Sequence, residues 1–373
     1  MNLALFPLSI VLIVLVGCAS PITTDMRTEN LHATLVRLAA QYHVCGVAIA
    51  VIKNRKLDLI DSATGCQPAL IVNTDSVFQA ASLSKTVFAY EVLKLAEQGK
   101  LELDTPVIKY LPYGYLHQFE PFATKPPLKT DWVTDPKIQA VTARMVLNHT
   151  SGLPNWASGP LNFDSAPGVK WQYSGEGFLL LQHVVEAVTR EPLDQLMTAQ
   201  VFKPLDMNHS SYVWEARFER NILLGTKANG APRQQWSFTT PIAPVTLYTS
   251  AEDYGKFLVT LLNDHHVLKQ ITESPVTVDS SLNLSWGLGW GVERTKDDIF
   301  IWHWGNNPGY RAFVIASVRT GDGFVMLTNS ENGLKLAEPI THKVLPGEHK
   351  IFKFPMLDDG ITDLLCQNLG LCF

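Results

Sequence analysis

A serine and a lysine three residues apart form the pair in this sequence best suited to chemistry. Ser82 and Lys85 lie at the start of an apolar stretch that continues to Gln98. Side chains three positions apart share one face of a helix, so the hydroxyl and the amine can come within hydrogen-bond distance. Serine becomes a nucleophile once a base removes its proton, and lysine can be that base when burial lowers its pKa. The pair predicts catalysis through a covalent acyl-enzyme, although a capping serine beside a solvated lysine has the same spacing.

Other short motifs follow this pair along the chain. Tyr173-Ser174-Gly175 lies in the middle of the sequence, and His303-Trp304-Gly305 ends a strand-like run. Further marks, in order, are residues 99–101, 103–106, 146–154, 202–207, 250–254 and 305–309. From about Leu31 to Val344 the chain thereby resembles the serine β-lactamase and penicillin-binding-protein-like hydrolases. The similarity is to their class C-like branch, which includes esterases and D-amino-acid peptidases.

The resemblance implies a role for each matching residue. Ser82 attacks a carbonyl carbon, Lys85 accepts its proton, and Tyr173 shares that proton transfer and delivers a proton to the leaving group. The backbone N–H groups of Ser82 and Asn306 form the oxyanion hole. Neither a metal nor an organic cofactor is required, and the implied substrates are small molecules or peptides, including peptidoglycan-derived ones. His149, in segment 146–154, is interpreted as structural because it belongs to a family loop rather than to the catalytic set.

Two positions of the implied substrate-binding set depart from the family pattern. Gly175 stands where lactamases of this branch usually carry asparagine, and it has no side-chain amide to hold an acylamino substituent. His303, which with Gly305 lies on the edge strand expected to line the site, stands where many relatives carry lysine. Histidine titrates near neutrality, so it would recognise a carboxylate less reliably than lysine. Both departures favour an esterase or peptidase over an efficient β-lactamase.

Two rival functions remain compatible with the sequence. One is a non-turnover penicillin-binding or cell-wall-binding envelope lipoprotein, which acylates slowly or not at all. The other is a structural envelope lipoprotein. Ser82, Lys85 and Tyr173 each have a role only if acylation occurs, so their joint presence favours an enzyme. The physiological substrate, the source of the deacylating water and the oligomeric state are left open by the sequence.

The elements that must position these residues alternate between α and β patterns. Helices are predicted over residues 23–41, 82–98, 178–188, 252–262 and 331–344. Short β-rich runs cover residues 46–52, 57–61, 299–302, 312–316 and 324–327. We therefore predict an α+β fold, in which a five-stranded antiparallel sheet flanked by helices joins a mostly helical domain.

The order of these elements also predicts the limits of each part. The sheet part would take residues 23–66 and 245–345, the helical part residues 67–244, and the site would lie in the cleft between them. Residues 346–373 form a C-terminal tail to which the sequence assigns no role.

Length and composition narrow the class of protein. Of the 373 residues, 46% are apolar and 17% are charged, which is a globular composition with enough apolar residues for a large core. The formal net charge is -5, and no long run of Lys and Arg occurs. These features argue against nucleic acid as a partner.

The first twenty residues are typical of an export signal. Residues 3–16 are apolar except for Pro7 and Ser9, too short a run to span a bilayer comfortably. They end in Leu15-Val16-Gly17-Cys18, which resembles the lipobox of bacterial lipoproteins. We predict a signal peptide over residues 1–18 and a lipid on Cys18, which would anchor the protein in the cell envelope as its only membrane contact. A plain signal peptide is the alternative.

Export permits disulfides among the four remaining cysteines. Cys45 and Cys66 flank two β-rich runs joined by a polar turn, so a hairpin would bring them together at its open end. Cys366 and Cys372 would form a second, local bridge in the tail. Free buried thiols are the alternative.

Overall fold

The computed structural model describes residues 30–66, 71–123 and 125–357. The export signal with Cys18 lies outside the described residues, as do Cys366 and Cys372, so these predictions stay predictions. Within the described part of the chain, no helix combines the length and the apolar character needed to cross a membrane.

The centre of the molecule is an antiparallel sheet of eight strands, in the order β2-β1-β12-β11-β10-β9-β8-β7. The strands are β1 (Val47–Lys53), β2 (Lys56–Ala63), β7 (Val276–Asp279), β8 (Leu284–Trp286), β9 (Gly291–Arg294), β10 (Ile299–Asn307), β11 (Tyr310–Ser317) and β12 (Gly323–Thr328). The five predicted strands are β1, β2, β10, β11 and β12, and the α+β class is confirmed. The predicted number of five is wrong, because β7 to β9 have only three or four residues each and are too short to show an alternating pattern.

An early and a late segment of the chain pair in this sheet. β1 pairs antiparallel with β12, with Ala48 opposite Leu327, although the two strands are far apart in sequence. β1 and β2 form the predicted hairpin, and the predicted disulfide between Cys45 and Cys66 closes its open end.

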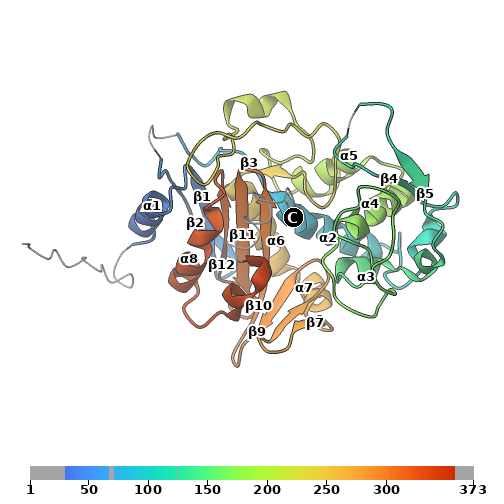
Figure 1. Cartoon of the computed structure of the whole chain (residues 1–373). Helices are drawn as coiled ribbons and strands as arrows, with labels where there is room; N and C mark the ends of the chain where they lie inside the picture. The colour runs from blue at the N-terminus through green and yellow to red at the C-terminus, as the bar shows by residue number, and fades with distance from the viewer. Residues whose placement is uncertain (1–29, 67–70, 124, 358–373) are drawn as a thin grey trace, which may run out of the picture.

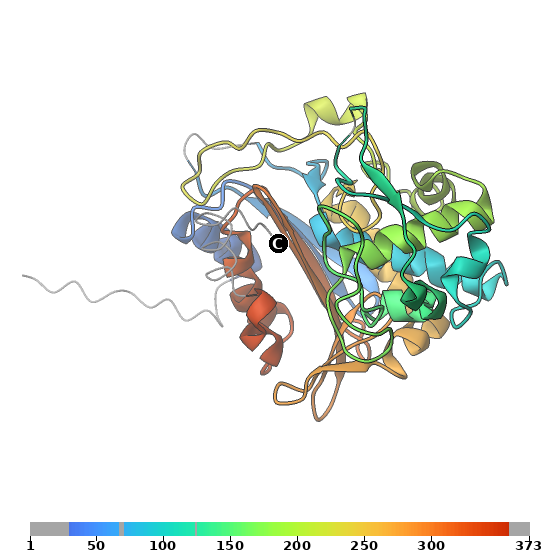
Figure 2. The same cartoon turned by 45° about the vertical axis from the view of Figure 1, so that its right-hand side comes forward.

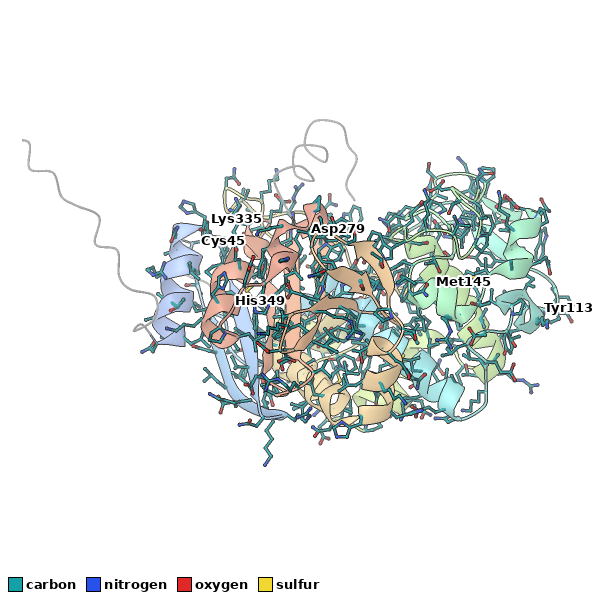
Figure 3. The ribbon with its side chains drawn as sticks, turned by 90° about the horizontal axis from the view of Figure 1, so that it is seen from below. Cys45, Tyr113, Met145, Asp279, Lys335 and His349 are labelled. Carbon is teal, nitrogen blue, oxygen red and sulfur yellow. A yellow bond between two sulfur atoms is a disulfide. The ribbon has the colours of Figure 1, made fainter. Side chains whose placement is uncertain are left out.

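Helices cover both faces of the sheet (Figures 1 and 2). One face carries α1 (Leu31–Gln41) and α8 (Ala337–Val344), whose Leu35 and Ile340 pack in one apolar cluster with Phe313 of β11 and Met326 of β12. The other face carries α2 (Ser84–Glu97) and α6 (Ala251–Asn263). That face continues into the helical part, which lies beside the sheet in Figure 2 and contains Met145, labelled in Figure 3.

The remaining helices and strands lie in the helical part and in the segment that follows it. The helices are α3 (Ala143–Leu147), α4 (Gly175–Thr189), α5 (Leu193–Met197) and α7 (His265–Thr272). Two small antiparallel pairs join β3 (Phe78–Gln79) to β6 (Tyr248–Thr249), and β4 (Leu116–Gln118) to β5 (Thr130–Trp132).

The first and last predicted helices, like the one predicted from residue 82, begin later than expected. The described part of the first helix runs from Leu31, where the side chain of Asn30 caps it by accepting a hydrogen bond from the Ala33 N–H. The helix predicted from residue 331 is instead a short 3-10 turn, Gly333–Leu336, followed by α8.

Part of the C-terminal tail belongs to the fold. The tail contains two 3-10 turns, Lys350–Lys353 and Pro355–Leu357. Ile351 and Phe354 are buried in the apolar cluster beneath α1 and α8. The tail up to residue 357 therefore covers the sheet face opposite α2.

Candidate active site

Ser82 lies at a strained turn between β3 and α2. The predicted helix from residue 82 begins instead with a 3-10 turn, Ala81–Leu83, and α2 starts at Ser84. Ala81 has φ of 50°, in the left-handed region that alanine rarely adopts. Such strain persists only where surrounding structure imposes it, and it gathers at functional sites. Ser82 itself is half-buried.

Lys85 is a buried amine that makes a hydrogen bond with this serine. Its side chain is 1% exposed, and Nζ donates to Ser82 Oγ at 3.1 Å and to the Pro244 carbonyl oxygen at 2.9 Å. Within the described residues, no carboxylate forms an ion pair with it. Burial holds the pKa of Lys85 well below its ordinary value, because the charged form loses its hydration. The arrangement favours a neutral amine that can accept the proton of Ser82.

Tyr173 lies over the same amine. Its ring centroid is 4.7 Å from Lys85 Nζ, and the residue is 9% exposed. Burial raises the pKa of the Tyr173 phenol, and the neighbouring Ser82 hydroxyl opposes that shift only in part. The buried phenol oxygen nevertheless makes no hydrogen bond of standard geometry with any residue that the structure describes. At neutral pH Tyr173 therefore keeps its proton and can act as a donor rather than as a phenolate base.

His303 lies near the site but is neutral. Its ring is fully buried, and Nδ1 lies 2.7 Å from the Trp304 carbonyl oxygen, so Nδ1 carries the proton. Burial, and secondarily the amine of Lys85, lower the pKa of His303 to about 3. The expectation that this histidine titrates near neutrality is therefore wrong, because that expectation assumed a solvated ring. It supplies no positive charge for a substrate carboxylate at neutral pH.

The strand that carries His303, β10, has an unpaired edge over only part of its length. β10 lies between β9 and β11, so it is not the outer strand that the sequence suggested. However, β9 pairs only with residues 299–302 of β10. Residues 303–307 are therefore left without a β9 partner, and Asn306 lies in this stretch opposite Arg311 of β11.

Gly305 brings this stretch against the turn that carries the nucleophile. A Cβ at Gly305 would lie 3.1 Å from Ala81 Cβ and closer still to the Ala80 carbonyl oxygen. No other residue permits β10 to approach the 3-10 turn so closely. Gly305 therefore positions Ser82 and Asn306 relative to each other rather than contacting a substrate through a side chain.

Gly175 is also fixed by crowding. It is the first residue of α4, and its N–H donates to the Asn155 side-chain oxygen at 3.0 Å. A Cβ here would meet the Asn155 carbonyl oxygen at 2.7 Å and the Trp156 ring at 3.0 Å. The space that an asparagine side chain would need at this position is thus occupied by segment 155–156.

Three features of the site were not predicted from the sequence. The Pro244 carbonyl has no side-chain signature, and the strain at Ala81 depends on contacts made by distant residues. His149, interpreted as structural, packs its ring 4.4 Å from that of Tyr173. A buried histidine with φ of 58° is unusual, but the sequence does not reveal its conformation.

Comparisons with known proteins show which family the chain belongs to. The chain is 23% identical to penicillin-binding protein 4* of Bacillus subtilis over 332 residues, covering 76% of this chain and 67% of that protein. It spans about two thirds of the length of the curated relatives that it matches.

Solved structures share the fold at low sequence identity. D-alanine carboxypeptidase AmpC from Burkholderia cenocepacia matches with a TM-score of 0.66 and 19% identity, over 82% of this chain and 97% of that one. D-amino acid amidase from Ochrobactrum anthropi SV3, complexed with L-phenylalanine amide, matches with a TM-score of 0.65 and 20% identity, over 84% and 96%. The family model described as Beta-lactamase matches residues 31–345, so the chain belongs to the beta-lactamase family.

Proposed function

We propose that the protein is a serine hydrolase that forms an acyl-enzyme on Ser82, with Lys85 as base and Tyr173 as proton donor. The observation that carries the proposal is the buried Lys85 amine 3.1 Å from Ser82 Oγ, without a carboxylate partner within the described residues. A lysine with a purely structural role would be stabilised by an ion pair with a carboxylate or by contact with water. This amine is instead directed at a hydroxyl.

The proposed reaction has a balanced course. Ser82 Oγ bonds to the substrate carbonyl carbon while its proton passes to Lys85 Nζ. The backbone N–H groups of Ser82 and Asn306 would stabilise the oxyanion. The C–N or C–O bond then breaks, the leaving group takes the Tyr173 hydroxyl proton, and Lys85 returns its proton to Tyr173. Water hydrolyses the ester at Ser82 in a second round.

We propose amides and esters without a free carboxylate near the scissile bond as the preferred substrates, D-amino-acid amides among them. Neutral His303 offers no charge to pair with a carboxylate, and Gly175 offers no amide to an acylamino group. Both points favour an amidase or esterase over a carboxypeptidase or an efficient β-lactamase. The resemblance to D-amino acid amidase, together with the family, supports the amide class.

The test compares purified wild type with Ser82→Ala on four substrates. These are D-phenylalanine amide, D-phenylalanyl-D-alanine with its terminal carboxylate, a p-nitrophenyl ester and a chromogenic cephalosporin. Intact mass is recorded in each reaction to detect an acyl adduct. We expect turnover of the amide and the ester and slower reaction of the dipeptide and the cephalosporin, which both carry a carboxylate. Every activity should be lost in Ser82→Ala.

Each other outcome has a defined meaning. Turnover that persists in Ser82→Ala would contradict the nucleophile. A stable adduct on Ser82 without turnover would favour the rival function, a non-turnover penicillin-binding protein. Faster reaction of the dipeptide than of the amide would contradict the proposed substrate class while leaving the nucleophile intact.

A further inference from the structure

His149 holds the backbone on both sides of Tyr173. Its carbonyl oxygen accepts a hydrogen bond from the Gln172 N–H at 2.8 Å, and its ring Nδ1 accepts one from the Ser174 N–H at 3.1 Å. The same ring packs 4.4 Å from the Tyr173 ring. One residue thus fixes the backbone before and after the tyrosine and limits the position of its ring.

The end of a helix does not by itself explain this histidine. His149 lies two residues beyond the end of α3, with φ of 58°, at a position where helices usually carry glycine. Histidine and asparagine tolerate this conformation better than most residues, but glycine adopts it without strain. The imidazole is fully buried, so its presence here is best explained by its contacts with segment 172–174.

The hydrogen bonds of His149 also define its charge. Because Nδ1 accepts the Ser174 N–H, the ring carries its proton on Nε2 and is neutral. The titratable groups that face it are Lys85 of α2, Tyr173 and His303 of β10. Burial, then Lys85 and His303, hold the pKa of His149 well below its ordinary value. A second proton would remove the acceptor for Ser174 and add a positive charge near Lys85.

We propose that His149 is a positioning residue, which holds Tyr173 where its hydroxyl can protonate the leaving group. This inference rests on the proposed function. It predicts a selective defect, because an amine must be protonated as the C–N bond breaks, whereas p-nitrophenolate leaves without a proton. Loss of the ring contacts with Tyr173 and Ser174 should therefore impair amide hydrolysis more than ester hydrolysis.

The experiment uses His149→Gly and His149→Asn in the full chain. Both residues accept the positive φ, but only asparagine offers an oxygen that can accept from the Ser174 N–H. We expect kcat for D-phenylalanine amide to fall by about 100-fold in His149→Gly, while kcat for the p-nitrophenyl ester falls by less than about fivefold and both KM values change little. His149→Asn should recover most of the amide activity.

Matched controls separate this role from a loss of stability. His349→Asn removes another buried imidazole, whose partners are Glu293 and Leu345 rather than segment 172–174, and should leave the amide-to-ester ratio unchanged. An equal fall of both activities in His149→Gly, an unchanged amide rate, or no recovery in His149→Asn would overturn the positioning role. If Ser82→Ala stays active, the proposed function fails instead, so the two failures are distinguishable.

Discussion

At the scale of single residues, the burial of Lys85 affects both stability and catalysis. The Lys85 amine lies against a hydroxyl, a carbonyl oxygen and the rings of Tyr173 and Phe178. Its burial removes hydration and thereby disfavours its charged form. The same setting is what makes the amine a base, since a solvated lysine would stay protonated at neutral pH. Stability and catalysis therefore make opposite demands at this position.

Lys85→Met separates the two demands. Methionine has a similar length and no charge, so we expect turnover to fall by roughly 10²- to 10⁴-fold through loss of the base. The free energy of unfolding should change by no more than about 1 kcal/mol, because removing a buried amine offsets the loss of its hydrogen bonds. Rate assays and urea denaturation measure both quantities. Retained turnover would contradict Lys85 as the base.

Gly175→Asn tests whether the departure from the family pattern is reversible. The new side chain would collide with the Asn155 carbonyl oxygen and the Trp156 ring. We expect destabilisation of about 1–3 kcal/mol and no gain of cephalosporin hydrolysis. Thermal denaturation measures the stability, and the chromogenic cephalosporin measures lactamase activity. The double variant Trp156→Ala/Gly175→Asn is the control, because it relieves part of the crowding. A stable, lactamase-active Gly175→Asn would show that crowding does not limit this position.

At the scale of elements, a buried ion pair fastens the tail to the sheet. His349 lies in the sheet half of the molecule, away from Tyr113 of the helical part (Figure 3). Its Nδ1 is 2.9 Å from Glu293 Oε2 of β9, and its Nε2 is 3.0 Å from the Leu345 carbonyl oxygen. Both partners are acceptors, so the imidazole satisfies both only when it is protonated. Burial would lower the pKa of His349, but the hydrogen bond and charge of Glu293 raise it above its ordinary value.

This pair makes stability depend on pH in a defined direction. Because the folded pKa of His349 is raised, the folded state binds its proton more tightly than the unfolded chain does. The stabilisation is complete below about pH 6.5, the unfolded pKa, and is lost as pH rises through the folded pKa. Urea denaturation at pH 6 and pH 9 measures the free energy of unfolding. This free energy should decrease more between the two pH values in wild type than in His349→Asn. Equal decreases would show that the ion pair contributes nothing.

At the scale of the whole molecule, the sheet part and the helical part share one core. The larger apolar cluster contains Ala50 of β1, Val87 of α2, Leu180 of α4 and Val314 of β11. The pairing of β1 with β12 further requires an early and a late segment of the chain before the sheet is complete. Neither part can therefore bury its apolar surface without the other.

We expect a single cooperative unfolding transition as a result. Calorimetry should give a calorimetric enthalpy equal to the van't Hoff enthalpy, as for one cooperative unit. Far-UV circular dichroism and tryptophan fluorescence should report the same midpoint, because the tryptophans lie in both parts. Two separated transitions would mean that the parts fold independently despite their shared core.

The sequence by itself determined which side chains are available for catalysis and where the longer strands lie. The spacing of Ser82 and Lys85 places both side chains on one face, and the long apolar strands β1, β10, β11 and β12 are visible as local patterns. The hairpin between Cys45 and Cys66 made their disulfide a candidate, and the structure contains it. Local spacing is enough for these features because neighbours in sequence create them.

Tertiary structure alone decided the protonation state of the site residues and which remote segments contact them. His303 is neutral because distant segments bury it, and Lys85 is held by a carbonyl 159 positions away. β7 to β9 exist because the sheet gives such short segments a partner. Gly175 has no room for a side chain because segment 155–156 lies against it. Burial and contact are set by residues remote in sequence, so the pattern of neighbours along the chain could not predict them.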